Sequence, residues 1–153
     1  MKTIEALDTI DRGIREMFQL HKNLISGFRP KIGPSGLNHT HWRAMMHISE
    51  SGSDCMKGVG RHVGLEAGSF TPVADRLIDE GLVERIPDPE DRRRILLRLT
   101  ASGRSAVKEM KRLLKKHYAR KLSFLDEKQL GDLVSAMAAI SEINSTLQGR
   151  SNE

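Results

Sequence analysis

The sequence predicts a mainly α-helical protein with one small β-hairpin. Apolar residues recur every three or four positions through most of the chain, which is the period of amphipathic helices. Alternation of apolar and polar residues, the pattern of a half-buried strand, occurs between residues 82 and 99. At 153 residues the chain has the length of one domain with a substantial core.

Charge and composition favour a soluble protein with an anionic partner. Lys and Arg number 25 against 20 Asp and Glu, and the net charge of +5 suits a polyanion such as nucleic acid. No run approaches the ~18 apolar residues of a membrane span, and residues 1–12 lack the apolar core of a signal peptide. The single cysteine, Cys55, excludes an intrachain disulfide framework. We therefore expect a cytoplasmic protein without a membrane partner.

Two helices are expected before residue 53. The first covers residues 3–28 and has apolar side chains spaced by three and four, at Ile4, Leu7, Ile10, Ile14, Met17, Leu24 and Phe28. A run rich in Pro and Gly then breaks it. Asn38 is a good N-cap for a second helix, which carries Trp42, Met45 and Met46 on one face and ends near Gly52.

A helix-turn-helix follows. Residues 56–63 are long enough for two helical turns, residues 64–68 form a turn, and another helix begins near Ser69. Its apolar set lies at i, i+3, i+4, i+7 and i+8, namely Phe70, Val73, Ala74, Leu77 and Ile78, and Gly81 closes it. Such helices cross closely, and Gly60 supplies the small residue that the crossing needs. The opposite face presents Ser69, Pro72 and Arg76.

The stretch from Gly81 to Thr100 predicts a hairpin with strands over 82–86 and 95–99. Alternation puts Ile95, Leu97 and Leu99 on one face and Arg94, Leu96 and Arg98 on the other. The tip contains two prolines and three successive arginines, but residues 84–94 hold four basic and four acidic side chains. Its function must therefore come from the placement of charges rather than their sum. A helix-turn-helix that runs into a hairpin is a winged helix.

Two more helices complete the chain. Thr100 can cap a helix that ends near Leu122 and includes Met110 and Leu114 among its apolar positions. Asp126 and Gln129 resemble a capping box. They open a last helix with an apolar side of Leu130, Leu133, Val134, Met137, Ile140 and Leu147. The long terminal helices cannot bury these apolar stripes against so small a winged helix. We therefore expect the stripes to be buried by dimerisation.

Three segments follow one another in the sequence: HWRAMMHI, GRHVGLEAGSFTPVADRLIDEGLVER and PDPEDRRRILLRLTASGR. This ordered combination resembles the MarR family of transcriptional regulators over about residues 37–104. The most specific element is the Asp two residues before an Arg, here Asp91 and Arg93. The resemblance implies a homodimer that binds double-stranded DNA. Its two winged helices would each contact one half of a palindrome. It also implies one MarR-like domain over 1–153, with dimerisation helices at 3–30 and 101–148 and the winged helix-turn-helix at 37–100.

The same resemblance assigns DNA contacts by type. Ser69, Thr71, Pro72 and Arg76 would meet base edges and phosphates in the major groove. Arg93 would enter the minor groove, with Asp91 orienting it through a bidentate pair. Arg92 and Arg94 are expected to contact phosphates. Arg85, at the base of the hairpin, is either a further contact or the partner of Asp79 or Glu80.

Many family members also bind small aromatic or phenolic effectors. The candidate pocket here is a mainly apolar set from the first, second and fifth helices: Met17, His21, Trp42, Met45, Met46, Met110 and Leu114. Core packing is the competing role for most of them. Cys55 is expected to be an inert thiol, since the peroxide-sensing branch keeps its cysteine in the first helix.

No cofactor and no metal are expected, and His39 and His41 have a spacing that suits a strand better than a helical metal site. The sequence has no phosphate loop, nucleophile elbow or catalytic cluster, which argues against an enzyme. We expect a DNA-binding repressor. The alternative is a winged-helix module that binds protein and does not recognise a DNA sequence.

Overall fold

The computed structural model describes residues 2–34 and 36–150, apart from the side chains of residues 2, 3, 67 and 150. The chain folds into two compact units. One consists of the two chain ends, up to Phe28 and from Lys115 onward, and the other runs from Arg29 to Leu114. Within the described ranges, no helix has the length and apolarity that crossing a lipid bilayer requires.

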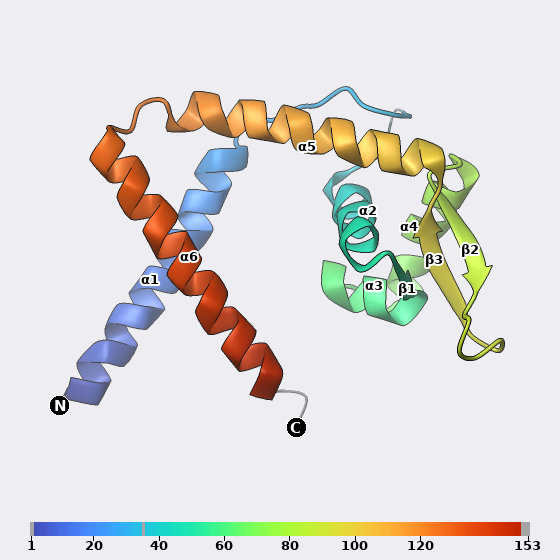
Figure 1. Ribbon diagram of the computed structural model, residues 1–153, viewed down its shortest axis with the longest axis horizontal. Coiled ribbons are helices and arrows are strands. Elements are labelled where there is room, and N and C mark those ends of the chain that lie inside the picture. The colour runs from blue at the N-terminus through green and yellow to red at the C-terminus, as the bar shows by residue number, and fades with distance from the viewer. Residues whose placement is uncertain (1, 35, 151–153) are drawn as a thin grey trace. The chain divides into compact units, whose positions relative to one another are not determined.

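The unit from Arg29 to Leu114 is a winged helix, as the sequence predicts (Figure 1). It contains, in chain order, α2 His39–Ser51, β1 Ser53–Cys55, α3 Met56–Val63, α4 Ala67–Asp79, β2 Val83–Pro87, β3 Ile95–Leu99 and the first turns of α5 Ala101–Leu122. The predicted helix-turn-helix is therefore α3 and α4, and the predicted hairpin is β2 and β3.

The sheet has three strands in the order β1-β3-β2, both pairs antiparallel. Val83 pairs with Leu99 and Pro87 with Ile95 in the hairpin, and Ser53 pairs with Arg98 on the other side of β3. The sequence did not predict β1. Ser-Asp-Cys has little intrinsic strand preference, and this strand exists because β3 offers it a free edge of backbone groups.

The core of this unit lies between α2, α3, α4 and the sheet. The largest fully buried side chains are Phe70, Met45, Ile48, Leu77, Leu97, Val59 and Val83. Leu97 and Leu99 point inward as the alternation predicts. Ile95 shares their face but is 45% exposed, because it lies nearer the hairpin tip and beyond the core.

The helix ends follow the predicted caps. The Thr100 hydroxyl oxygen accepts the Gly103 N–H at 3.0 Å at the start of α5. Gly81, with φ at +67°, ends α4 because its N–H reaches Ile78 O and the Leu82 N–H reaches Leu77 O. These local signals place the turn into β2.

His41 takes a part in the α2 cap that the sequence did not reveal. Asn38 Oδ1 accepts the N–H groups of Thr40 and His41, and the His41 ring Nδ1 accepts the Asn38 N–H at 3.1 Å. The ring thus completes a capping box in the position usually taken by Glu or Gln. Burial, and then the Arg76 charge, lower the pKa of His41 below its ordinary value of 6.5.

We expect stability to fall as the pH drops below about 6.5, where an unfolded histidine takes up its proton. The folded state resists that proton because its pKa is lower, and a protonated Nδ1 could no longer accept the Asn38 N–H. His41→Gln keeps an acceptor but cannot be protonated, so its unfolding free energy should depend less on pH in chemical denaturation. His21→Gln, at an exposed position, is the control; an equally steep pH dependence in all three proteins would contradict the role.

The unit of the chain ends contains α1 Lys2–Ile25, the last turns of α5 and α6 Glu127–Arg150. The predicted capping box opens α6, since Gln129 N–H donates to Asp126 Oδ1 at 2.7 Å and Asp126 N–H to Gln129 Oε1 at 3.0 Å. α1 ends at Ile25 rather than near Phe28. Gly27 has φ at +76°, a left-handed conformation that terminates the helix.

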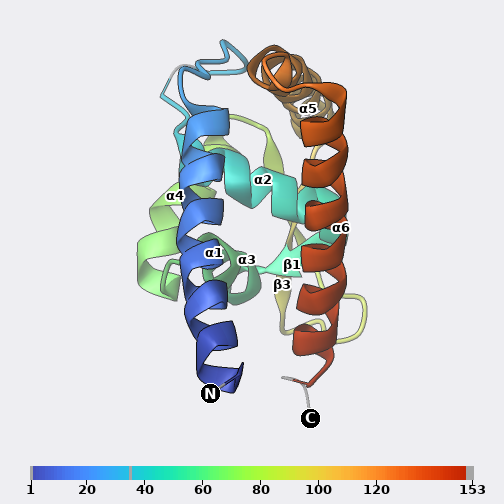
Figure 2. The same cartoon turned by 90° about the vertical axis from the view of Figure 1, so that its left-hand side faces the viewer.

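Both terminal helices leave their apolar stripes exposed. On α1 these are Ile4, Leu7, Ile10, Ile14 and Phe18, and on α6 Leu130, Val134, Met137, Ile143 and Leu147. The two helices cross in the projection of Figure 1 but stand apart in Figure 2. They therefore do not cover one another within a single chain, and two apolar surfaces of this length remain to be buried.

Candidate functional site

α3 and α4 meet through Gly60, as the sequence predicts. A Cβ atom at this position would lie 3.2 Å from both the Phe70 Cβ and the Leu65 carbonyl oxygen. That spacing is tighter than an ordinary van der Waals contact, so a side chain here would push the helices apart. Gly64, with φ at +77°, then turns the chain into α4.

α4 buries one face and exposes the other. Phe70, Ala74 and Leu77 are fully buried. The four α4 residues predicted to contact DNA are all exposed: Ser69, Thr71, Pro72 and Arg76. The structure therefore brings the four together on one accessible face of a short helix.

The start of α4 differs from the prediction. The helix begins at Ala67, two residues before Ser69, so Pro72 lies beyond the first turn. A residue with an N–H at this position would donate to the Gly68 carbonyl, and proline cannot. Pro72 therefore removes one helical hydrogen bond from α4.

Acidic side chains of α4 hold the arginines beside this face. Arg76 Nη2 lies 2.5 Å from Glu80 Oε1, and Arg85 Nη2 lies 2.7 Å from Asp75 Oδ1. The expected partners of Arg85, Asp79 or Glu80, are both wrong. β2 packs so that Arg85 lies beside the middle of α4, one turn before those residues.

At the wing tip, Asp91 binds Arg93 through two hydrogen bonds. The Asp91 Oδ1 atom accepts the Arg93 backbone N–H at 3.0 Å and its Nε at 3.2 Å. A single oxygen takes both bonds, so the pair differs from the bidentate fork that the sequence predicted. These two bonds lower the pKa of Asp91. The Arg93 side chain is 91% exposed beyond its anchor, and Arg92 beside it is exposed as well.

Asp88 supports the tip from below, which the sequence did not show. It is buried, and its Oδ1 accepts the Glu90 N–H at 2.9 Å while Oδ2 lies 3.6 Å from Arg94 Nε. The Asp88 N–H also donates to Arg94 O at 3.0 Å and closes the loop. An Asp before a proline is a frequent turn initiator, and this was the available signal. Arg94 is thus tied to the loop, and Arg93 projects from it.

The candidate effector residues lie on both units. Met17 is half-buried and His21 exposed on α1, in the unit of the chain ends. Met45 and Met110 are buried, and Met45 is part of the winged-helix core. Trp42 and Met46 pack against that core, and Leu114 is half-buried. Core packing accounts for Met45, since its side chain has no accessible surface.

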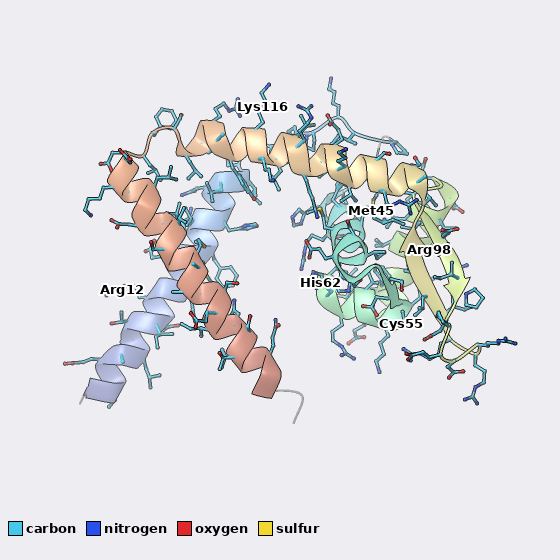
Figure 3. The ribbon with its side chains drawn as sticks, viewed as in Figure 1. Arg12, Met45, Cys55, His62, Arg98 and Lys116 are labelled. Carbon is cyan, nitrogen blue, oxygen red and sulfur yellow. The ribbon has the colours of Figure 1, made fainter. Side chains whose placement is uncertain are left out.

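Cys55 and His41 both have roles at helix N-termini. The Cys55 sulfur accepts the Gly58 N–H at 3.4 Å, at the point where β1 runs into α3 (Figure 3). His41 belongs to the α2 cap. Across residues 2–34 and 36–150 there is no group of three or more His, Cys, Asp or Glu side chains arranged to hold a metal ion.

Comparison with known proteins agrees with this geometry. The model of the MarR family matches residues 37–95, from the start of α2 to the start of β3. The HTH-type transcriptional regulator FarR of Neisseria gonorrhoeae is 24% identical over 131 residues, which cover 86% of this chain and 90% of FarR. The repressor IacR of Pseudomonas putida is 26% identical over 94 residues, 61% of this chain and 56% of IacR.

Solved structures show the same architecture. BpsR of Bordetella bronchiseptica, whose DNA binding is regulated by 6-hydroxynicotinic acid, superposes with a TM-score of 0.61 at 21% identity, covering 87% of this chain and 98% of that one. The family model thus matches a chain with three features: a helix-turn-helix packed through Gly60, a wing in which an aspartate holds an arginine, and long flanking helices. Over residues 37–95, its winged helix-turn-helix, the chain matches the MarR family.

Proposed function

We propose that this protein is a homodimeric repressor that binds a palindromic operator and releases it when a small aromatic acid binds. The observation that carries the DNA-binding part is the pairing of two exposed elements on one unit. These are the polar face of α4 and the outward Arg93, which Asp91 holds at the wing tip.

The two elements suit the two grooves of a duplex. α4 offers Ser69 and Thr71, whose short hydroxyl side chains allow close approach to base edges in the major groove, with Arg76 one turn further on. Arg93 suits the narrow minor groove, where the negative potential attracts a guanidinium. Arg92 and Arg94 would contact phosphates, and Arg85 and Pro72 would border the contact made by α4. Asp91 acts by positioning Arg93.

The exposed stripes of α1 and α6 support a homodimer. Ile10 is 57% exposed on α1 and Val134 is 62% exposed on α6, each in the middle of its stripe. A second copy would bury both stripes at once in a symmetric interface. The resulting pair of α4 helices would then read two half-sites.

Selection of bound sequences from random duplex DNA tests this function. We expect a palindrome with half-sites about one helical turn apart, and binding that weakens steeply as salt rises. Sedimentation of the protein with the selected duplex should give two chains per duplex. Binding to a protein partner, with no DNA recovered, would instead establish the interaction module.

His117 gives the effector proposal a specific hydrogen-bond donor, which the sequence did not reveal. It lies in the part of α5 that belongs to the chain-end unit, 7% exposed, with its ring centroid 5.1 Å from that of Phe28. Arg120 Nη2 lies 3.2 Å from its Nδ1. A guanidinium only donates, so Nδ1 of the neutral ring accepts and the proton sits on Nε2.

The His117 Nε2 is a buried donor that needs an acceptor. It has no hydrogen-bond partner within the described part of the chain. A buried unpaired N–H costs roughly 1–3 kcal/mol, so a molecule that brings an oxygen to it would gain that much. A carboxylate or phenolic oxygen on a ring that packs against Phe28 meets both conditions, and 6-hydroxynicotinic acid, which regulates BpsR, has this chemistry.

We expect 6-hydroxynicotinic acid to weaken operator binding by the wild type. His117→Phe should need at least about tenfold more of the acid for the same weakening, because losing one hydrogen bond to a charged group reduces the affinity for the acid by about that factor. The variant keeps an aromatic ring beside Phe28 and should bind operator normally without the acid. His21→Phe, at the exposed position proposed from sequence, is the matched control. Equal release of all three proteins, or no release of the wild type, would refute the role of His117.

A further inference from the structure

The positive charge of this protein is concentrated in one helix. Residues 104–121 contain eight basic residues and one acidic residue, a net charge of +7. The remaining residues contain 17 basic and 19 acidic residues, a net charge of −2. Residues 37–100 hold nine basic and ten acidic residues, so the winged helix itself carries −1. The excess charge therefore lies outside the recognition helix and the wing.

These basic residues occupy the outward face of α5. Val107 and Met110 are buried, and Val107 is part of the winged-helix core. The basic side chains recur at intervals of three and four on the opposite side of the helix, at Arg104, Lys108, Lys111, Arg112, Lys115 and Lys116. Figure 3 shows Lys116 projecting outward from α5. We call these six residues the α5 basic stripe.

Four of the six stripe residues form no ion pair within the described part of the chain, and one of these, Arg104, donates to the Leu99 carbonyl oxygen. Lys111 Nζ lies 3.9 Å from Glu50, and Arg112 pairs with Glu109 at 2.7 Å. Lys108, Lys115 and Lys116 are exposed and form no ion pair with any residue of the described ranges. By contrast, three of the four wing arginines between residues 92 and 98 are paired, Arg93 with Asp91, Arg94 with Asp88 and Arg98 with Glu84, and among the described residues Arg92 alone of the four forms no ion pair. The stripe thus contains most of the excess positive charge, which would attract a polyanion.

We propose that the α5 basic stripe binds the phosphate backbone of a second DNA duplex without reading its sequence. Lysines on one helix face suit point contacts to phosphates and carry no base readout. The hairpin runs away from α5, so within the unit from Arg29 to Leu114 the wing tip lies at the opposite end from the first turns of α5, which carry Arg104, Lys108, Lys111 and Arg112 (Figure 1). A straight duplex that lies on the wing tip therefore leaves the stripe free for another segment.

This inference rests on the proposed function only in requiring that a first duplex occupies α4 and the wing. The protein would hold its operator on one surface and a second stretch of duplex on the other. Such bridging is sequence-independent on the α5 side and disappears as salt rises, because each phosphate contact releases counterions.

A two-duplex capture experiment tests the proposal on the full chain. Operator duplex on beads is saturated with protein, washed, and offered a labelled duplex of unrelated sequence. The variant Lys108→Glu/Lys115→Glu/Lys116→Glu replaces the three unpaired lysines of the stripe. A matched control, Lys22→Glu/Lys31→Glu/Lys128→Glu, changes the net charge by the same amount at exposed positions outside α5.

We expect the wild type and the control to capture the labelled duplex, and the stripe variant to lose about tenfold or more of that capture, as three lost phosphate contacts predict. Binding of a single operator duplex should remain within about threefold, since the stripe does not read bases. Equal capture by the stripe variant and the control would overturn the proposal, as would anionic lipid vesicles being captured in place of DNA. Operator binding without second-duplex capture by the wild type overturns it while the proposed function stands. Absence of any operator binding defeats the proposed function itself.

Discussion

Replacing Gly103 by alanine should destabilise the protein by about 3 kcal/mol, the upper part of the range for forced overpacking. A Cβ atom at this position would lie 2.0 Å from the Leu82 carbonyl oxygen and 3.3 Å from Leu99 Cδ2. The oxygen cannot move aside freely, because it accepts the Thr100 N–H at 3.1 Å and anchors the start of the hairpin to its end. Chemical denaturation of the purified variant measures the loss.

Gly131→Ala is the control for this substitution. Gly131 also lies inside a helix, α6, but a Cβ there would meet no atom within 4 Å. Alanine should therefore stabilise the protein by up to about 1 kcal/mol through helix propensity. If both variants unfold at the same denaturant concentration, the contact between α5 and the hairpin does not constrain position 103.

Arg93→Ala should weaken binding to the selected operator by about 1–3 kcal/mol and leave thermal stability nearly unchanged. The Arg93 side chain is 91% exposed, and among the described residues its one ion pair is with Asp91, so its removal should leave the packing of the core unchanged. Fluorescence anisotropy with the operator duplex measures the affinity. Asp91→Ala should give a smaller loss, because Arg93 would keep its charge but lose the two bonds that aim it.

Arg12→Ala, on the exposed surface of α1, is the charge-matched control and should retain wild-type affinity. If it weakened binding as much as Arg93→Ala does, the effect would be one of net charge rather than of the wing tip. Unchanged affinity in Arg93→Ala would remove the minor-groove role altogether.

Features set by neighbouring residues could be predicted from the sequence. The caps at Asn38, Thr100 and Asp126, the αL glycine at Gly81 and the Asp91–Arg93 pair depend on side chains within a few positions of one another. Helical and strand periodicities also placed α3, β3 and the buried face of α4 correctly. The fold class followed from the order of these local signals.

Features set by distant contacts could not be predicted in the same way. β1 exists because β3 lies beside it, and the partner of Arg85 depends on how β2 packs along α4. In the sequence, Asp88 cannot be told from the other charged residues of the loop. Its support of the tip becomes clear from its burial and from the hydrogen bond that it accepts from Glu90. His117 likewise lies within a basic helix, so its unpaired Nε2 becomes visible once burial is known.

α5 belongs to both compact units, and this has a mechanical consequence. Its 22 residues form one uninterrupted helix roughly 33 Å long at 1.5 Å per residue. Such a helix acts as a lever, because a tilt of about 5° at one end displaces the other by about 3 Å, comparable to the helix shifts known in allosteric switches. If the proposed ligand binds beside His117, a small reorientation of α5 would therefore be enough to shift its N-terminal turns, which belong to the winged helix, by the width of a base contact.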